Sequence, residues 1–364
     1  MALQCGIIGI ANVGKSTLFN CMSNTKVEIT SFAFTTNKSN VGVVNVPDPR
    51  LDMLVNFQPT EKVIPATVGI IDIPGLTKGA NKGEGVGNQF LSDIRNSDAL
   101  IHVLRCFDDK ELSHIEGSVN PVRDIETINL ELQVKDLESV EKKIIRLGKL
   151  AKTGDKDAKH GIDVLKVYQD HLENFQNAST APVQESDKKY IDDMLLLTAK
   201  PVMYVCNVED EAAVLGNEYV KSVKDFLKDE ETEILVLAAR LEAEISELDE
   251  EDRKEFLEDA GLTEPGVGKL VRSAYSLLNL MSFFTVGPKE NRAWTIKKGM
   301  TAPQAAGVIH SDLERGFIRA EVIKYEDFIT LGSENACKVA GKLNVEGKNY
   351  VVGDGDILHI RFNV

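Results

Sequence analysis

Short apolar runs rich in β-branched residues recur along the first two thirds of the chain. The runs are LQCGIIGI (3–10), NVGVVNV (40–46), TVGIIDI (67–73), ALIHVLRCF (99–107), PVMYVCN (201–207) and EILVLAA (233–239). Segments in which apolar residues have helical spacing lie between them, such as GNQFLSDIRN (87–96) and NEYVKSVKDFLKD (217–229). Strands that alternate with helices predict a doubly wound α/β sheet, whose functional site forms from loops at the carboxyl ends of the strands.

This alternation is interrupted between residues 124 and 198, where no strand pattern occurs. Apolar residues recur mostly three to five positions apart, a polar break follows at 152–161, and a second periodic stretch covers 162–175. The pattern predicts an antiparallel helical hairpin inserted into the first domain. One face of its first helix carries four basic residues, Lys142, Lys143, Arg146 and Lys149. They form either a specific basic contact or an ordinary solvated face.

A third region follows a predicted closing helix at 271–282. It contains a predicted hairpin (282–299), a helix (301–317) with Pro303 in its first turn, a strand (317–328) and a strand–turn–strand unit (348–364). A small mixed sheet holding one helix indicates a separate α+β domain. The expected organisation is a nucleotide-binding domain formed by 1–123 and 199–280, an inserted hairpin at 124–198, and a C-terminal domain at 281–364.

The charge and the cysteine content of the chain limit the partners and the compartment that we expect. The net charge is −15, but residues 229–264 alone hold fifteen acidic and three basic side chains, so the acidity is local. A basic RNA-facing surface elsewhere is therefore compatible with the composition. The five cysteines are scattered without C-x-x-C spacing, as expected of buried thiols in a reducing cytosol. Because neither a signal peptide nor a membrane span is predicted, we expect a cytoplasmic protein without a membrane partner. The oligomeric state stays open, with a monomer favoured.

The segment GIANVGKS (9–16) satisfies the phosphate-loop pattern G-x-x-x-x-G-K-[ST] through Gly9, Gly14, Lys15 and Ser16. Glycines let backbone N–H groups surround the phosphates, the lysine reaches the β and γ oxygens, and the hydroxyl ligates magnesium. A predicted strand precedes the segment and a predicted helix follows it, which puts the phosphates over a helix N-terminus. The sequence therefore predicts a nucleotide site.

A second motif predicts the partner half of this site. The segment DIPG (72–75) ends an apolar run, so that Asp72 would contact magnesium through water and the Gly75 N–H would meet the γ-phosphate. Between the two motifs, FAFTTNKSNVG offers Thr35 and Thr36 as the threonine that reaches magnesium. Leu76 stands where Ras-type enzymes have the glutamine that orients water. We therefore expect slow intrinsic hydrolysis.

The base-reading loop is ambiguous. Where GTPases carry N-K-x-D, this chain reads NVED, from Asn207 to Asp210. The asparagine and Asp210 fit guanine, but Val208 replaces the lysine that packs over the base. At this level both adenine and guanine stay open.

Five longer segments are spread over all three regions of the chain: NVGKSTLFN, GLTKGANKGEGVGNQFL, VNPVRDIETINLEL, AWTIKKGMTAPQAAGVIHSDLERGFIRAEV and DGDILHIRFNV. Through them the chain resembles the YchF / Obg-like ATPase family nearly from end to end. It implies a P-loop GTPase-like α/β domain, an inserted coiled-coil hairpin and a C-terminal β-grasp (TGS) domain. It also implies Mg²⁺ as cofactor, ATP preferred over GTP, and association with the ribosome, its 50S subunit or RNA.

Carried over by motif, the resemblance assigns individual roles. The phosphate loop falls on Asn12, Val13, Gly14, Lys15, Ser16 and Thr17; the magnesium ligands fall on Ser16 and Thr36; and the base-recognising residue falls on Asn207. The histidine that family members carry in the loop after the fourth strand matches His114, a candidate catalytic group. Asp210 departs from the family's N-x-x-E pattern, and FAFTTNKS lacks two prolines of the family's FPFCTIEP.

Asn12 and the overall function each leave alternatives open. In related Obg-type GTPases an asparagine at this position helps to hold a potassium ion beside the phosphates, whereas here Asn12 could equally just stabilise the turn. The functional alternatives are an ATP-hydrolysing switch on the translation machinery, a GTPase, and a ribosome-binding module whose nucleotide turnover is incidental. A small-molecule kinase is disfavoured, because a D-x-x-G switch and a TGS domain have no evident role in one.

Overall fold

The computed structural model describes residues 3–23, 40–75, 86–114 and 116–363, which divide into two units. The first unit holds the described residues of 3–23, 40–42 and 69–267, and the second holds 43–68 and 268–363. Both boundaries on the N-terminal side fall inside strands, β2 (Asn40–Asn45) and β4 (Thr67–Asp72). Thr35, Thr36 and Leu76 lie outside the described residues.

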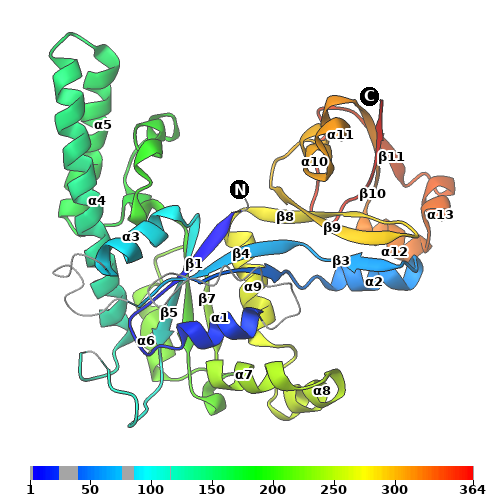
Figure 1. Ribbon diagram of the computed structural model, residues 1–364, viewed down its shortest axis with the longest axis horizontal. Helices are drawn as coiled ribbons and strands as arrows, with labels where there is room; N and C mark the ends of the chain where they lie inside the picture. The colour runs from blue at the N-terminus through cyan, green and yellow to red at the C-terminus, as the bar shows by residue number, and fades with distance from the viewer. Residues whose placement is uncertain (1–2, 24–39, 76–85, 115, 364) are drawn as a thin grey trace. The chain divides into compact units, whose positions relative to one another are not determined.

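The first unit is built on a doubly wound sheet with the strand order β2-β4-β1-β5-β6-β7 (Figure 1). Its other strands are β1 (Gln4–Ile8), β5 (Ala99–Arg105), β6 (Val202–Asn207) and β7 (Ile234–Leu237). From β4 to β7 every neighbouring pair is parallel. The strand β1 has β4 on one side and β5 on the other, so the chain continues on opposite sides of β1. The carboxyl end of β1 is therefore a topological switch point. The predicted α/β class is confirmed.

The helices of the first unit are α1 (Lys15–Ser23), α3 (Val86–Asn96), α4 (Pro121–Ala151), α5 (Lys156–Glu173), α6 (Glu218–Phe226), α7 (Ala239–Glu247) and α8 (Glu250–Asp259). Short 3₁₀ turns cover Ala178–Thr180, Glu185–Tyr190, Asp192–Met194, Leu197–Ala199 and Asp210–Ala212. The helix α9 (Gly266–Leu277) carries the chain on into the second unit.

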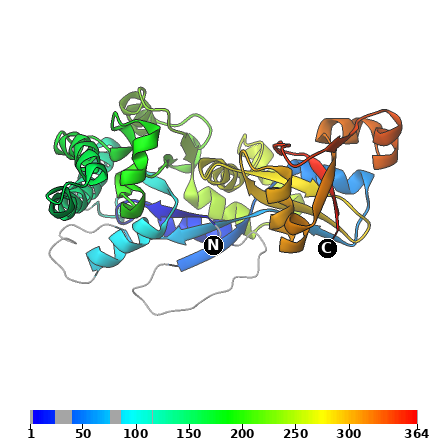
Figure 2. The ribbon, with the colours of Figure 1, turned by 90° about the horizontal axis from the view of Figure 1, so that it is seen from above.

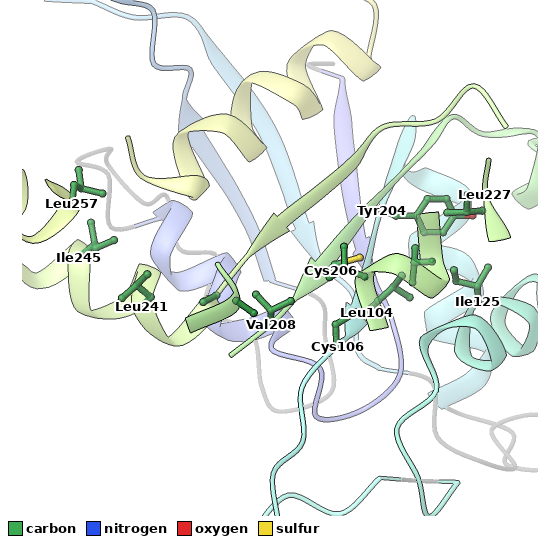
Figure 3. Packing of buried hydrophobic residues seen from close by; sticks show 14 residues of the cluster. Leu104, Cys106, Ile125, Tyr204, Cys206, Val208, Leu227, Leu241, Ile245 and Leu257 are labelled. Atoms are coloured by element: carbon green, nitrogen blue, oxygen red, sulfur yellow. The ribbon is translucent and has the colours of Figure 1, made fainter. Parts of the chain in front are cut away.

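The core of the first unit gathers on β5, β6 and the helices beside them (Figure 3). Leu104, Tyr204 and Cys206 extend from the strands, Leu227 at the end of α6 lies beside Tyr204, and Leu241 of α7 lies on the other side, beyond Val208. All five cysteines lie among the described residues, are buried and form no disulfide, which agrees with the expectation from their spacing. Burial of these side chains fixes β6 and therefore the loop that follows it, where the base-reading motif lies.

The predicted hairpin is present as α4 and α5, which lie side by side (Figures 1 and 2). Asn120 caps α4 by accepting from the Arg123 N–H, and Asp155 caps α5 by accepting from the Ala158 N–H. Val140, Val164, Leu165, Tyr168 and Leu172 form their apolar seam. Residues 124–198, all of them described, contain helices and turns but no strand.

A buried carboxylate closes the insertion back onto α4. Asp136 is fully buried and accepts three hydrogen bonds, from the Leu197 N–H (2.8 Å), the Thr198 N–H (2.8 Å) and the Thr198 hydroxyl (2.7 Å). Burial raises the pKa of this carboxyl, while the hydrogen bonds from Thr198 and Leu197 act in the opposite direction. Asp136 thus holds the end of the insertion where the chain enters β6.

The second unit contains a six-stranded sheet with the order β11-β10-β12-β8-β9-β3. Its strands are β3 (Lys62–Ile64), β8 (Leu280–Thr285), β9 (Glu290–Lys297), β10 (Phe317–Ile323), β11 (Leu343–Glu346) and β12 (Ile357–Phe362). Its helices are α2 (Pro49–Phe57), α10 (Ala302–Ile309), α11 (Ser311–Arg315), α12 (Tyr325–Leu331) and α13 (Glu334–Val339). Phe283, Ile296 and three alanines of α10 form its core.

The structure differs from the predicted division of the chain because residues 43–68 belong to the second unit. The strand β3 pairs in parallel with β9, and Asn291 (0% exposed) donates to the Gln58 carbonyl at 2.9 Å. Arg50 donates to Asp354 at 2.9 Å and also pairs with Asp48. A three-residue strand whose partner lies more than 200 positions away leaves no local signal in the sequence.

Two details of the predicted C-terminal region are wrong. The predicted strand 317–328 ends at Ile323, because the helix α12 begins at Tyr325. The predicted strand after 348 is reduced to one bridge between Thr301 and Val351, and the unpredicted strand β11 pairs with β10 instead. Phe328 and Val352 are buried in these two places without belonging to a strand, and hydrophobicity alone does not distinguish such residues from strand residues.

Candidate functional site

The phosphate loop joins β1 to α1 as predicted, and its backbone explains its residues. Gly9 and Gly14 have φ of 149° and 97°, values that side chains with a Cβ rarely adopt. A Cβ added at Gly14 would lie 2.5 Å from the Asn207 amide nitrogen, so the loop is also closely packed. Asn12 has φ of 64°, in the left-handed region that asparagine tolerates best after glycine. Its amide nitrogen lies 3.4 Å from the Ser113 carbonyl.

Lys15 is the buried cation of the loop. Only 7% of it is exposed, and its ammonium donates to the Ile10 carbonyl at 2.6 Å. Burial lowers its pKa to about 8, and the nearby Asp72 carboxylate acts in the opposite direction. Gly75 lies against it, since a Cβ at Gly75 would come within 2.7 Å of the ammonium nitrogen. The two motifs therefore meet, and Lys15 is pre-positioned beside the DIPG segment.

Two of the three predicted magnesium ligands lie together. The Ser16 hydroxyl donates to the Asp72 carboxylate at 3.0 Å, although 56 residues separate them in the chain. Burial raises the pKa of Asp72, and the hydrogen bond from Ser16 and the charge of Lys15 lower it. A hydroxyl and a carboxylate oxygen are the hard ligands that Mg²⁺ prefers, so this donor set fits the ion. The third predicted ligand, Thr36, lies outside the described residues.

Asn207 connects the base-reading loop to the phosphate loop. It is 4% exposed, its amide nitrogen donates to the Val13 carbonyl at 2.9 Å, and its amide oxygen accepts from the Ala239 N–H at 2.8 Å. One side chain thus fixes the phosphate loop and the start of α7 relative to each other. Thr17, also predicted to contact nucleotide, is exposed on α1.

The two other base-loop residues predicted to contact nucleotide, Val208 and Asp210, have different environments. Val208 is 4% exposed and packs in the core of the first unit, where Figure 3 shows it beside Cys206. Its side chain therefore serves packing, and the position of the GTPase lysine carries no polar group. Asp210 begins a 3₁₀ turn, and its carboxylate lies 3.9 Å from the Arg240 guanidinium. Burial raises its pKa, and the charge of Arg240 lowers it.

The sequence of the whole chain identifies the family to which this site belongs. Proteins named ribosome-binding ATPase YchF from Bacillus subtilis (strain 168) and Haemophilus influenzae are 48% and 47% identical to it, each over 100% of both chains. The chain belongs to the YchF family. Two family models match, one described as a 50S ribosome-binding GTPase at residues 4–146 and the YchF-GTPase_C model at residues 280–363.

A solved structure supports this assignment. The Schizosaccharomyces pombe YchF GTPase has 36% sequence identity and a TM-score of 0.87, over 99% of this chain and 98% of that one. The family predicted from the quoted motifs is confirmed, and so is the combination of a P-loop domain with an inserted hairpin and a C-terminal domain.

His114, the candidate catalytic histidine of the sequence analysis, contacts the start of the inserted hairpin. Its side chain is 3% exposed, with Nε2 3.2 Å from the Asp124 carboxylate and Nδ1 accepting the Glu116 N–H at 3.1 Å. If Nδ1 accepts, the proton is on Nε2, which then donates to Asp124. In this conformation both ring nitrogens bond within the loop and α4. The link from this loop to the phosphate loop is the contact between Ser113 and Asn12.

Sequence reasoning missed Arg105, which shapes the loop that carries His114. Arg105 is 1% exposed, and its guanidinium donates to three backbone carbonyls, of Phe107 (3.2 Å), Asp109 (3.3 Å) and Leu112 (3.0 Å). It also stacks over the Phe107 ring, 4.9 Å from the centroid. A buried arginine satisfied by carbonyls organises the backbone around it. The signal in the sequence was an arginine at the end of an otherwise apolar strand.

The basic helix face predicted on the hairpin is partly neutralised. Lys143 and Arg146 both pair with Asp193, and Lys143 also donates to the Tyr190 carbonyl. Lys142 and Lys149 are exposed. Two of the four basic residues therefore pair with an acidic residue of the insertion itself. Among the described residues, none of the helices combines the length and apolar character needed to cross a bilayer.

Proposed function

We propose that this protein is a magnesium-dependent nucleotide hydrolase that uses ATP in preference to GTP and acts as a nucleotide-controlled switch on the ribosome, in the cytoplasm. The observation that carries the proposal is the assembly of Lys15, Ser16 and Asp72 at one point of a chain whose full-length relatives are named ribosome-binding ATPases. A phosphate loop alone binds nucleotide; the paired second motif makes the site sensitive to the γ-phosphate.

Magnesium would be held by Ser16 and Asp72 together with Thr36. When bound, the ion supplies positive charge to the phosphate oxygens. Two groups of the protein would make the remaining contacts with the phosphates. Lys15 brings a buried cation to the β and γ oxygens, and the Gly75 N–H offers a hydrogen bond to the γ-phosphate. Loss of the γ-phosphate removes that last contact, which is how the DIPG segment would report the nucleotide state.

The proposed preference for ATP rests on two features. The buried Val208 stands where GTPases have the lysine that packs over the base. The relatives that are 48% and 47% identical over the full length are named ATPases. The related S. pombe protein is named a GTPase, and Asp210 is the residue that could read guanine. A free carboxylate pairing with guanine N1 and N2 would be worth about 1.5–3 kcal/mol, which is tenfold or more in affinity.

Catalytic help must come from a group other than a glutamine after the DIPG segment. Asn12 could hold a potassium ion, although its left-handed backbone already explains an asparagine there. The potassium hypothesis requires faster hydrolysis in potassium than in sodium at equal ionic strength, and loss of that difference in Asn12→Ala while nucleotide still binds. Equal rates in both salts make Asn12 structural and leave His114 or a ribosomal group as the candidate.

The main test replaces Lys15. Lys15→Ala should abolish ATP hydrolysis while thermal unfolding remains cooperative, because the lysine stabilises charge on the phosphoryl group. Lys221→Ala, which removes an exposed lysine of α6, is the matched control and should keep the wild-type rate. Undiminished turnover in Lys15→Ala would refute the assigned site.

A second candidate function is a ribosome-binding module in which nucleotide is only a structural ligand. The favouring observation is that the family model matching residues 4–146 is described by ribosome binding as well as by nucleotide. Co-sedimentation with ribosomes separates the two. A switch predicts that association changes between ATP and ADP and that Lys15→Ala loses this difference; a module predicts the same association in every state.

A further inference from the structure

The helix α7 lacks an N-terminal cap of its own. Its N-cap residue, Ala238, has no side chain that could accept a hydrogen bond, which leaves the N–H groups of the first turn to be satisfied by other residues. The Asn207 amide oxygen accepts from the Ala239 N–H at 2.8 Å. The Leu241 N–H lies on the side of the Asp210 carboxyl and acts to lower the pKa of that group, against the effect of burial. Asn207 of the base-reading motif therefore caps the first residue of the helix, and Asp210 lies toward the N–H of the third.

The remaining residue of this first turn, Arg240, faces the same carboxylate. Its guanidinium Nε lies 3.9 Å from Asp210 Oδ2 and 3.5 Å from Glu244 Oε1, one turn further along α7. The Arg240 side chain is 82% exposed and that of Asp210 is 36% exposed. Asp210 thus faces two groups of α7, a backbone N–H and a guanidinium at ion-pair distance, and both favour its charged form.

Guanine and adenine present different hydrogen-bonding groups at this position. Guanine presents two donors, N1–H and the N2 amino group, which a free carboxylate accepts together. Adenine presents an acceptor at N1 and lacks the N2 amino group, so that a free carboxylate would repel its N1 lone pair. A carboxylate that also faces a helix N-terminus and an arginine offers less to the guanine donors and repels the adenine N1 lone pair less.

We propose that Arg240 is a specificity-determining residue, which holds the Asp210 carboxylate against α7 and so withholds it from guanine. The inference rests on the proposed use of ATP and explains how an N-x-x-D motif is compatible with it. The pair is exposed, so its contribution is modest. Removing the arginine should shift the preference between guanine and adenine nucleotides by about threefold to fivefold at low salt.

The test measures the dissociation constants of ADP and GDP, which avoids turnover, for wild type and Arg240→Ala. We expect Arg240→Ala to raise GDP affinity relative to ADP by that factor, and the shift to shrink at high salt. Asp210→Asn removes the carboxylate, so adding Arg240→Ala to it should produce no further shift. Arg315→Ala, an exposed arginine paired with Asp312 in α11, is the matched control and should leave the ratio unchanged.

The outcomes separate this inference from the proposed function. An unchanged GDP-to-ADP ratio in Arg240→Ala, or an equal shift with and without the Asp210 carboxylate, would overturn the role of Arg240. Tighter binding of guanine than of adenine nucleotides by the wild type would overturn the proposed ATP preference. A further gain for GDP in Arg240→Ala would support the role of Arg240 even then.

Discussion

Nucleotide affinity should fall as the pH rises from neutral to alkaline, because the cation that meets the phosphates is itself titrating. Lys15 is 7% exposed, and burial lowers its pKa to about 8. The phosphates of a bound nucleotide favour the charged ammonium, so the pKa of Lys15 is higher in the complex than in the free protein. Binding therefore takes up a proton in this range, and it weakens wherever the free protein has already lost that proton.

The magnitude follows from the titration of one group. With a pKa of about 8, the free protein carries the Lys15 charge in about 90% of molecules at pH 7 and about 10% at pH 9. If only the charged form binds well, the dissociation constant rises about tenfold between these values, or about 1.4 kcal/mol. An ordinary exposed lysine, with a pKa near 10.4, would produce almost no change over the same range.

The assay is an equilibrium titration with a fluorescent ADP analogue, because the phosphates of ADP are already ionised across this range. Two variants isolate the lysine. Lys15→Ala should bind weakly and without a pH slope, and Lys15→Arg should also lack the slope because arginine keeps its charge. Equal wild-type affinities at pH 7 and pH 9 would refute the reasoning, and a slope that persists in Lys15→Ala would assign the titration to another group.

Three further substitutions test the close approach at Gly14, the buried hydrogen bonds of Asp136 and the buried imidazole of His102. Gly14→Ala should weaken nucleotide binding tenfold or more in titrations, because its Cβ would lie 2.5 Å from the Asn207 amide nitrogen; Gly154→Ala, with a similar φ of 92° and open space around it, should bind normally. Asp136→Asn should lower the free energy of unfolding, measured in urea, by about 3 kcal/mol, because it leaves buried donors unpaired. A decrease of less than about 1 kcal/mol would contradict this. Burial lowers the pKa of His102 to about 3 in the folded protein, whereas in the unfolded chain it has its ordinary value of about 6.5. As the pH falls below about 6.5 the unfolded chain therefore takes up a proton that the folded protein does not, and the free energy of unfolding decreases. His102→Leu should therefore unfold less readily in acid, and an unchanged acid profile would argue against this.

Local patterns in the sequence were sufficient for the phosphate loop, the DIPG segment and the inserted hairpin. Each depends on residues within about a dozen positions: glycines at a turn, a hydroxyl at a helix start, or apolar spacing along one helix face. The contact of Ser16 with Asp72 was also predictable, because parallel strands bring their carboxyl ends to one edge of the sheet.

Long-range packing decided the rest. The assignment of residues 43–68 to the second unit depends on pairing between β3 and β9 and on the pair formed by Arg50 and Asp354, which no local pattern encodes. The partners of His114 and Asp210 likewise come from α4 and α7. A motif specifies which chemical groups a site contains, because the spacing of its residues is fixed along the chain. Whether such a group is free for a ligand or already bonded depends on what the tertiary fold packs beside it, and this is why Asp210 was ambiguous in the sequence and is paired with Arg240 in the structure.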